Sequence, residues 1–202
     1  MPEPKNKIVL KTGFCYNDYL KGRLFNDRVV VINGEIMEYT AEDMTLNMAA
    51  LAGTSEPITV LITSYGGAVD AGTAVIRSIR AAQDKGIQVL GEVRGYAMSM
   101  ATLILQACDV RHAAPEDIIM VHGFSGVAIG DFRNQEADLK LTQRLTEIYS
   151  KFFAERSTAE DSKYHDAEYW KRLLEDSLPH YYFGHEAYEI GLIDEVILPI
   201  RE

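Results

Sequence analysis

The sequence has little of several features that mark large classes of protein. It contains two cysteines, Cys15 and Cys108, and no CxxC pair. This gives no basis for a disulfide framework or a zinc site, and it is typical of a reducing, cytoplasmic setting. No apolar run approaches the length of a membrane span, and the first residues, MPEPK, lack the apolar core of a signal peptide. We therefore expect a cytoplasmic protein with no membrane partner.

Basic residues are also scarce. The 202 residues include 20 Lys and Arg against 30 Asp and Glu, for a net charge of −10. Nucleic acid is not an expected partner, because binding to phosphates needs clustered Lys and Arg. The apolar and charged fractions, 47% and 25%, are those of an ordinary globular protein that is long enough for one large core.

Strand-like and helix-like segments alternate along the first half of the chain. β-Branched and apolar runs predict strands at residues 28–32, 57–62 and 87–93. Helical patterns follow them at residues 40–51, with Thr40 as the N-cap, and at 69–85 and 101–107. This order predicts an α/β fold built from βαβ units around a mostly parallel sheet. Functional sites in such sheets form at the carboxyl ends of the strands.

The second half of the chain contains shorter elements and one long helix. We predict short strands at 109–111, 118–121, 180–183 and 192–197, and helices at 166–174 and 184–190. A Gly-rich stretch, residues 123–130, predicts an exposed strand, and the helical pattern from 131 to 156 is long for this chain. Such an attachment is typical of a segment that packs against another subunit; a helix that spans the core is the alternative.

One short segment, residues 95–100 (GYAMSM), can carry chemistry. It follows a buried strand and precedes a helix, so a turn of small residues brings Ser99 to the first turn of that helix. Backbone N–H groups in a first turn lack partners within the helix and carry positive partial charge, which suits them to stabilise an oxyanion. The alternative is that Ser99 only caps the helix.

A nucleophilic serine needs a base, and the base needs a carboxylate to orient it. Of the five histidines, His122 is best placed, because it directly follows an apolar strand. His112 lies in a predicted polar turn, and His165, His180 and His185 lie near helix ends, where surface or capping roles are expected. A satisfied core histidine is the alternative for His122.

Two carboxylates are candidates for orienting the base. Asp176 ends a predicted helix just before a short strand, and Asp194 lies inside the last predicted strand. Their spacing does not choose between them. The glycine pair Gly66-Gly67 follows another strand at its carboxyl end, so it is expected to face the same crevice as Ser99.

Five segments, in order and with compatible spacing, resemble motifs of the ClpP family, the proteolytic subunit of the caseinolytic (Clp) protease. They are the entry to the first core strand at 23–28 (RLFNDR), the Gly-Gly loop at 63–67 (TSYGG), the nucleophile motif at 95–100, the histidine motif at 119–122 (IMVH) and the C-terminal signature at 191–197 (GLIDEVI). Each motif is weak alone, but five in register are highly specific.

The resemblance implies roles for individual residues. Ser99 would be the nucleophile, His122 the general base and Asp176 the orienting carboxylate, while Asp194 would be structural. The backbone N–H groups of Gly67 and Met100 would form the oxyanion hole. The reaction implied is hydrolysis of unfolded proteins and short peptides through an acyl-enzyme, with no metal and no cofactor.

The resemblance also implies a fold and an assembly. It predicts a ClpP/crotonase-like fold of repeated βα units, with an N-terminal arm at 1–22 and a single domain at 23–202. That domain includes a handle, strand plus long helix, at about 123–156. Two heptameric rings would stack through the handles into a closed tetradecamer. An AAA+ unfoldase that consumes ATP would dock on the ring face.

The sequence departs from the family pattern at several positions. Tyr65 stands where the family usually has Pro, Gly123-Phe124 where it has Gln-Pro, and Glu175 where it often has an Arg that couples the rings to the triad.

The docking pockets of the family are rich in aromatic residues, and the matched positions here are Thr59, Leu61 and Ala81. Fewer aromatic side chains predict a weaker grip on a hydrophobic loop.

Three other functions fit parts of this pattern. A catalytically silent subunit of a mixed ring is one, although such subunits usually lack triad residues. A crotonase-like acyl-CoA enzyme is another, but the sequence has no basic patch for the phosphates of CoA. A signal-peptide peptidase with a Ser–Lys dyad is disfavoured, because no lysine stands near these motifs.

Overall fold

The structure, a computed structural model, describes residues 22–124 and 132–198. Seven strands in this part of the chain form one sheet, in which five follow the order β1-β2-β3-β4-β7 and all pair in parallel. β5 pairs in parallel with β3, and β6 pairs antiparallel with β5. The strands are β1 (Val29–Ile36), β2 (Ile58–Gly67), β3 (Val89–Met98), β4 (Val110–Ala113), β5 (Ile118–Val121), β6 (His180–Phe183) and β7 (Glu195–Val196). The predicted α/β class with a mostly parallel sheet is confirmed.

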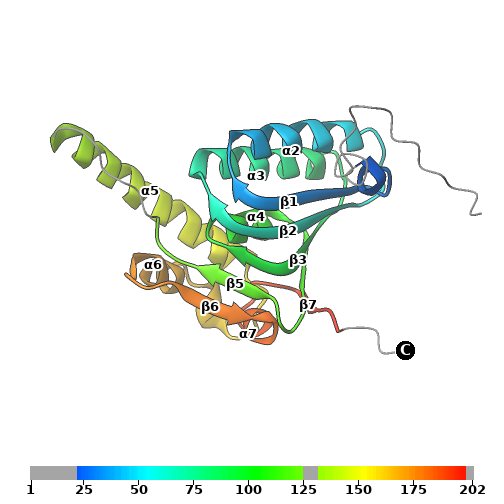
Figure 1. Cartoon of the computed structure of the whole chain (residues 1–202). Coiled ribbons are helices and arrows are strands. Elements are labelled where there is room, and N and C mark those ends of the chain that lie inside the picture. Colours follow the sequence, from blue (N-terminus) through cyan, green and yellow to red (C-terminus); the bar gives the residue numbers. More distant parts are fainter. Residues whose placement is uncertain (1–21, 125–131, 199–202) are drawn as a thin grey trace, which may run out of the picture.

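Helices cover one face of the sheet. Figure 1 shows α2 (Glu38–Leu51) and α3 (Val69–Gln83) side by side over β1 and β2, with α4 (Met100–Ala107) beneath them. In β2 the residues Ile58, Val60 and Ile62 are fully buried, whereas the residues between them are half-buried on the opposite face. Burial of each such side chain contributes about 1.5–3 kcal/mol, so the alternation fixes which face of β2 meets the helices.

β3 changes partner along its length. Residues 90–92 pair with β4, whereas residues 96–98 pair with β5. The two short strands therefore share one edge of β3, and β5 continues where β4 leaves off. This arrangement brings the end of β5 next to the end of β3, where Ser99 and His122 lie.

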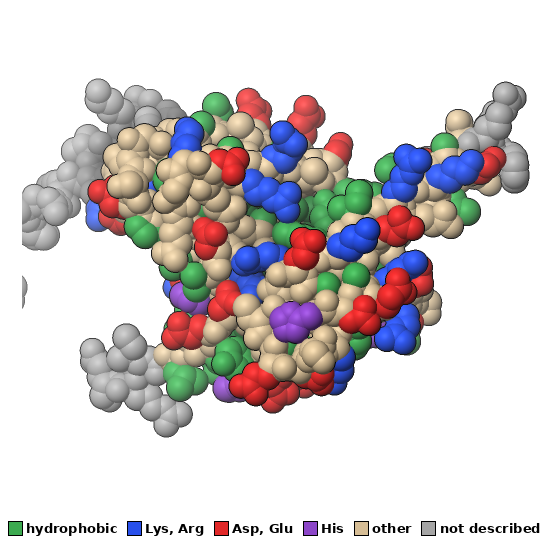
Figure 2. Space-filling view, turned by 180° about the vertical axis from the view of Figure 1, so that it is seen from behind, with side chains coloured by type: hydrophobic (Ala, Val, Ile, Leu, Met, Phe, Trp, Pro, Cys, Tyr) green, Lys and Arg blue, Asp and Glu red, His purple; other side chains and the backbone are tan. Residues whose placement is uncertain are grey.

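The long helix is α5 (Phe132–Arg156), and it projects from the body of the molecule (Figure 1). Its last turns are anchored, because Tyr149, Phe152 and Phe153 are buried and the ring of Phe153 stacks on Trp170 of α6 (Ala167–Glu175) at 4.9 Å. Its outer part carries charges of both signs and exposed apolar residues (Figure 2). The projecting helix is confirmed. The preceding stretch has no regular structure at residues 122–124, and residues 125–131 of the predicted strand lie outside the described part.

Several predicted boundaries are wrong. α2 begins at Glu38, so Thr40 is not its N-cap; instead its Oγ1 accepts a hydrogen bond from the Met37 N–H at 3.2 Å. β1 continues past residue 32 to Ile36. His112 lies in β4 rather than in a polar turn.

At the end of the chain, β7 spans Glu195–Val196, so Asp194 precedes the last strand. α7 spans Gly184–Glu189, and a short 3-10 helix spans Ser162–His165. The predicted arm at 1–22 falls almost wholly outside the described residues, and that domain boundary stays a prediction. Among the described residues, no helix has the length and apolar character needed to cross a membrane.

Candidate active site

Ser99 is the single residue between β3 and α4. Its backbone has φ 55 and ψ −123, a conformation that costs a residue with a side chain about 1–3 kcal/mol. The turn is therefore sharper than predicted, because β3 runs on through Met98 rather than ending at residue 93. The Ser99 N–H donates to the carbonyl of Met120 in β5 at 2.9 Å, which helps to hold this strained residue in place.

His122 follows β5 directly and meets Ser99. Its Nε2 lies 2.7 Å from the Ser99 Oγ, which is hydrogen-bonding distance. Burial lowers the pKa of His122 below its ordinary value of 6.5, so the imidazole is neutral at neutral pH. A neutral ring whose Nε2 accepts from the hydroxyl carries its proton on Nδ1, and such a ring can take the hydroxyl proton.

Gly67 and Met100 lie beside Ser99, as predicted. All three line one cavity of about 60 Å³. A Cβ on Gly67 would lie 2.2 Å from the carbonyl oxygen of Ile36, so only glycine permits this approach of β2 to β1. Met100 is the first residue of α4, where backbone N–H groups have no acceptor within the helix. Gly67 and Met100 therefore lie at the same cavity as the Ser99 side chain.

Gly66 allows β2 to approach the serine itself. It has φ +101, and a Cβ there would lie 2.7 Å from the Ser99 Cβ and 3.1 Å from the Met100 nitrogen. Any side chain at this position would displace the nucleophile. The glycine pair that the sequence indicated therefore has two separate steric roles.

Most of the residues that line the cavity next to Ser99 have apolar side chains, and both polar and apolar atoms reach its surface. Beyond the residues already named, its walls come from α3, α4, β5, the residues after β5, α5 and α6; they are Val69, Leu103, Val121, Gly123, Phe124, Phe153 and Leu174. These side chains can pack against an apolar group of a ligand while an adjoining polar group of the same ligand lies at the Ser99 Oγ. Sequence reasoning did not find this cavity, since its walls come from segments far apart in the chain.

Asp176 lies near this site but contacts a different histidine. It is the C-cap of α6, and its Oδ1 accepts a hydrogen bond from the Leu178 N–H at 3.2 Å. Its Oδ2 lies 3.1 Å from the Nε2 of His180, within ion-pair distance, although the angle does not make a hydrogen bond. The described part of the chain includes both Asp176 and His122, and within it no hydrogen bond or ion pair joins the two. Of the three predicted catalytic residues, the structure therefore brings Ser99 and His122 into contact and leaves the Asp176 carboxylate apart from them.

Asp176 and His122 nevertheless share a wider cavity of about 700 Å³. Gly123, directly after His122, packs against the end of α6: a Cβ there would lie 2.2 Å from the Leu174 carbonyl oxygen and 4.0 Å from that of Asp176. The segment that carries the histidine therefore lies against the segment that carries the carboxylate.

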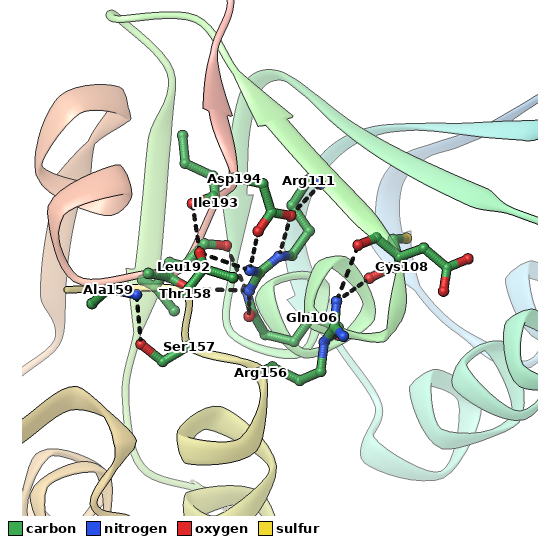
Figure 3. Close-up of polar contacts among 12 residues, drawn as sticks. Gln106, Cys108, Arg111, Arg156, Ser157, Thr158, Ala159, Leu192, Ile193 and Asp194 are labelled. Atoms are coloured by element: carbon green, nitrogen blue, oxygen red, sulfur yellow. Dashed lines mark hydrogen bonds and ion pairs between the residues drawn. The ribbon is translucent and has the colours of Figure 1, made fainter. Parts of the chain in front are cut away.

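The other candidate carboxylate, Asp194, is committed to Arg111. Its Oδ1 lies 2.6 Å from Nη2, and its Oδ2 accepts from both Nε at 2.9 Å and the backbone N–H at 2.8 Å (Figure 3). Arg111 is fully buried and also donates to the Gly191 carbonyl at 3.0 Å. Burial raises the pKa of Asp194, but the hydrogen bonds and charge of Arg111 outweigh this and lower it overall. Asp194 is therefore structural.

The remaining histidines lie away from Ser99. His112 is 3.5 Å from Glu195, the Nε2 of His165 lies 2.9 Å from the Ala159 carbonyl, and His185 is exposed. Sequence reasoning missed His180, whose four-residue spacing from Asp176 gave the only signal. In the described part of the chain, no three His, Cys, Asp or Glu residues gather as metal ligands would.

The chain as a whole matches a known class of protein. A family described as Clp protease matches residues 14–199. The chain belongs to the Clp protease family, and this membership supports a ClpP-type peptidase. Members of the family generally form oligomeric rings that work with Clp ATPases.

Proposed function

We propose that this protein is a serine endopeptidase that hydrolyses unfolded proteins and short peptides. The observation that carries the proposal is the 2.7 Å contact between the Ser99 Oγ and the His122 Nε2 at a sharp turn from strand to helix. A serine that only capped α4 would bond to the helix through its side chain, and Ser99 makes no such bond. The pairing with a neutral imidazole supports a nucleophilic role instead.

The proposed reaction uses both members of the pair in each half. His122 takes the proton as the Ser99 Oγ attacks the peptide carbonyl carbon, and the N–H groups of Gly67 and Met100 stabilise the oxyanion. The intermediate collapses to an acyl-enzyme when His122 gives the proton to the leaving amine. A water then attacks the ester in the same way, which releases the second product and restores Ser99. Asp176 would orient the ring through Nδ1.

The apolar side chains that line the cavity next to Ser99 support a preference among substrates. A peptide whose carbonyl carbon lies at the Ser99 Oγ would place the side chain before the scissile bond among Leu103, Phe153 and Leu174. An apolar side chain there would be desolvated favourably, whereas a charged one would be buried without a partner.

Exposed apolar surface supports self-association. The face of the sheet opposite α2 and α3 presents Tyr65, Tyr181 and Phe183, which are 66%, 55% and 52% exposed. Such surface on one side of a sheet is typical of an interface between subunits. A ring whose active sites face a closed chamber would restrict hydrolysis to unfolded chains and short peptides.

A docking pocket for the unfoldase would need residues from two copies of this chain. Thr59 and Leu61 are half-buried on the open face of β2, whereas Ala81 is exposed on α3, on the helical side. A pocket that contains all three would therefore form between neighbouring subunits. Its lack of aromatic side chains favours a weakly held or divergent unfoldase.

One observation favours a second function. The Asp176 carboxylate contacts His180 rather than His122, as expected for a catalytically silent subunit of a mixed ring. The two functions differ in the reactivity of Ser99.

Labelling with a fluorophosphonate serine-hydrolase probe tests the proposal. We expect the wild-type protein to label, Ser99→Ala to lose labelling entirely, and His122→Ala to label at least 100-fold more slowly. Ser55→Ala, which changes an exposed serine far from the pair in the chain, is the control and should label as the wild type does. An assembled, folded wild-type protein that does not label would favour the silent subunit.

A further inference from the structure

The Asp176 carboxylate contacts one histidine, His180, and lines the same cavity as a second, His122. His180 is the first residue of β6 and pairs across the sheet with Val121, the residue before His122. The antiparallel pair β5–β6 therefore fixes both imidazoles at the same end of the sheet. Asp176 is four residues before His180 and follows α6, whose end packs against Gly123.

The contacts of Asp176 point it toward His180. Its Oδ2 lies 3.1 Å from the His180 Nε2, an atom that is buried and has no hydrogen-bond partner. Its Oδ1 is held by the Leu178 N–H, which closes a turn directly after α6. The carboxylate is 43% exposed, so it can rotate about its own side-chain bonds without a change in the core.

The pKa of His122 agrees with an Asp176 carboxylate that does not contact it. The sole cause that lowers its pKa is burial, with no carboxylate to raise it. An imidazole in an aligned triad has a carboxylate at Nδ1, which favours the charged ring and raises its pKa. The other titratable residues that line the cavity shared by His122 and Asp176 are Glu175 and Tyr181.

We propose that His180 is a positioning residue that holds the Asp176 carboxylate away from His122. Full activity then requires the Asp176 carboxylate to leave His180 and to form a hydrogen bond with the Nδ1 of His122. This inference rests on the proposed serine peptidase function and adds to it a restraint supplied by β6. The segments that carry the two residues already pack against each other at Gly123.

The variant His180→Gln removes the imidazole that contacts Asp176 while keeping a polar side chain of similar reach. We expect the fluorophosphonate labelling rate of Ser99 to rise by roughly three- to tenfold, because the rate follows the fraction of molecules with an aligned carboxylate. The pKa that governs the acidic limb of the labelling rate should rise as well, since Asp176 then favours the charged form of His122. A merely structural role for His180 would not move that limb.

Two further variants make the test specific. His185→Gln changes an exposed histidine of α7 and should leave both the rate and the pH profile as in the wild type. In an Asp176→Asn background, His180→Gln should have no effect, because the carboxylate that it would release is gone. His180→Asn replaces the glutamine variant if the latter does not fold.

The outcomes separate this inference from the proposed function. If the wild type labels at Ser99 and folded His180→Gln labels no faster, the restraint does not exist and the peptidase assignment stands. A gain that persists in Asp176→Asn also overturns the restraint, because the effect then bypasses the carboxylate. If neither the wild type nor His180→Gln labels, the proposed function itself fails.

Discussion

The backbone N–H of Ser99 donates to the carbonyl of Met120 at 2.9 Å, so the proposed nucleophile is tied to the strand that carries the proposed base. The same carbonyl accepts a second hydrogen bond, at 2.7 Å, from the hydroxyl of Thr102 in the first turn of α4. Met120 and His122 are separated by one residue. These two hydrogen bonds between β5 and the start of α4 therefore help to set the distance between the Ser99 and His122 side chains.

Thr102→Val should loosen this connection. Thr102 is fully buried, and valine keeps its shape while removing the donor to the Met120 carbonyl. We expect a loss of about 1–3 kcal/mol in the free energy of unfolding and slower labelling of Ser99. Thr102→Ser, which keeps the hydroxyl, should label at nearly the wild-type rate. Urea denaturation and labelling rates check both variants. Equal stability and equal labelling rates for the two would argue against a role for the hydrogen bond between Thr102 and Met120.

The labelling rate of Ser99 should depend on pH through His122. Burial lowers the pKa of this histidine below 6.5, and only the neutral ring can accept the hydroxyl proton. The rate should therefore rise with pH through a pKa below 6.5 and stay level above it up to neutral pH. Rates measured from pH 4.5 to 8 check this. A midpoint above 7 in the wild type would show that a carboxylate already supports the ring.

Gly66→Ala should abolish labelling of Ser99. The new methyl group would lie 2.7 Å from the Ser99 Cβ and 2.8 Å from the Met98 carbonyl oxygen, at a backbone φ of +101. Gly86→Ala is a matched control, since Gly86 also has a positive φ, +80, but has no atom within 4 Å of the new methyl group. It should lose about 1–2 kcal/mol of stability from strain alone and keep its reactivity. Equal labelling of the two folded variants would contradict the steric role of Gly66.

The sequence predicts the fold class and the Ser99–His122 pair well, for local reasons. The run of apolar and β-branched residues from Ile58 to Ile62 is itself a local signal of a strand, and the structure confirms it as part of β2. The extension of β3 to Met98 was missed because it depends on pairing with β5, which is distant in the chain. The contact between Asp176 and His180 was missed for a similar reason, since it depends on how α6 ends against β6.

The ion pair between Arg111 and Asp194 should matter for stability rather than for chemistry. Asp194→Leu would leave the fully buried guanidinium without its carboxylate, and we expect a loss of about 3–5 kcal/mol in the free energy of unfolding. The double variant Arg111→Met with Asp194→Leu should be less destabilised than Asp194→Leu alone, because no unpaired charge remains buried. Urea denaturation checks this. A stable Asp194→Leu protein that fails to label would instead give Asp194 a catalytic role.

The exposed apolar residues of α5 should control assembly. Leu139, Leu141 and Ile148 are 58%, 56% and 59% exposed on the helix that projects from the body, and exposed leucines on an isolated helix favour contact with another subunit. Leu139→Asp with Leu141→Asp should therefore give a smaller assembly in sedimentation velocity, because a buried carboxylate without a partner is costly. Lys151→Asp is the control, since it changes charge on the same helix without removing apolar surface. If the leucine variant sediments as the wild type does, α5 does not form the contact between subunits, and self-association must use the open face of the sheet alone.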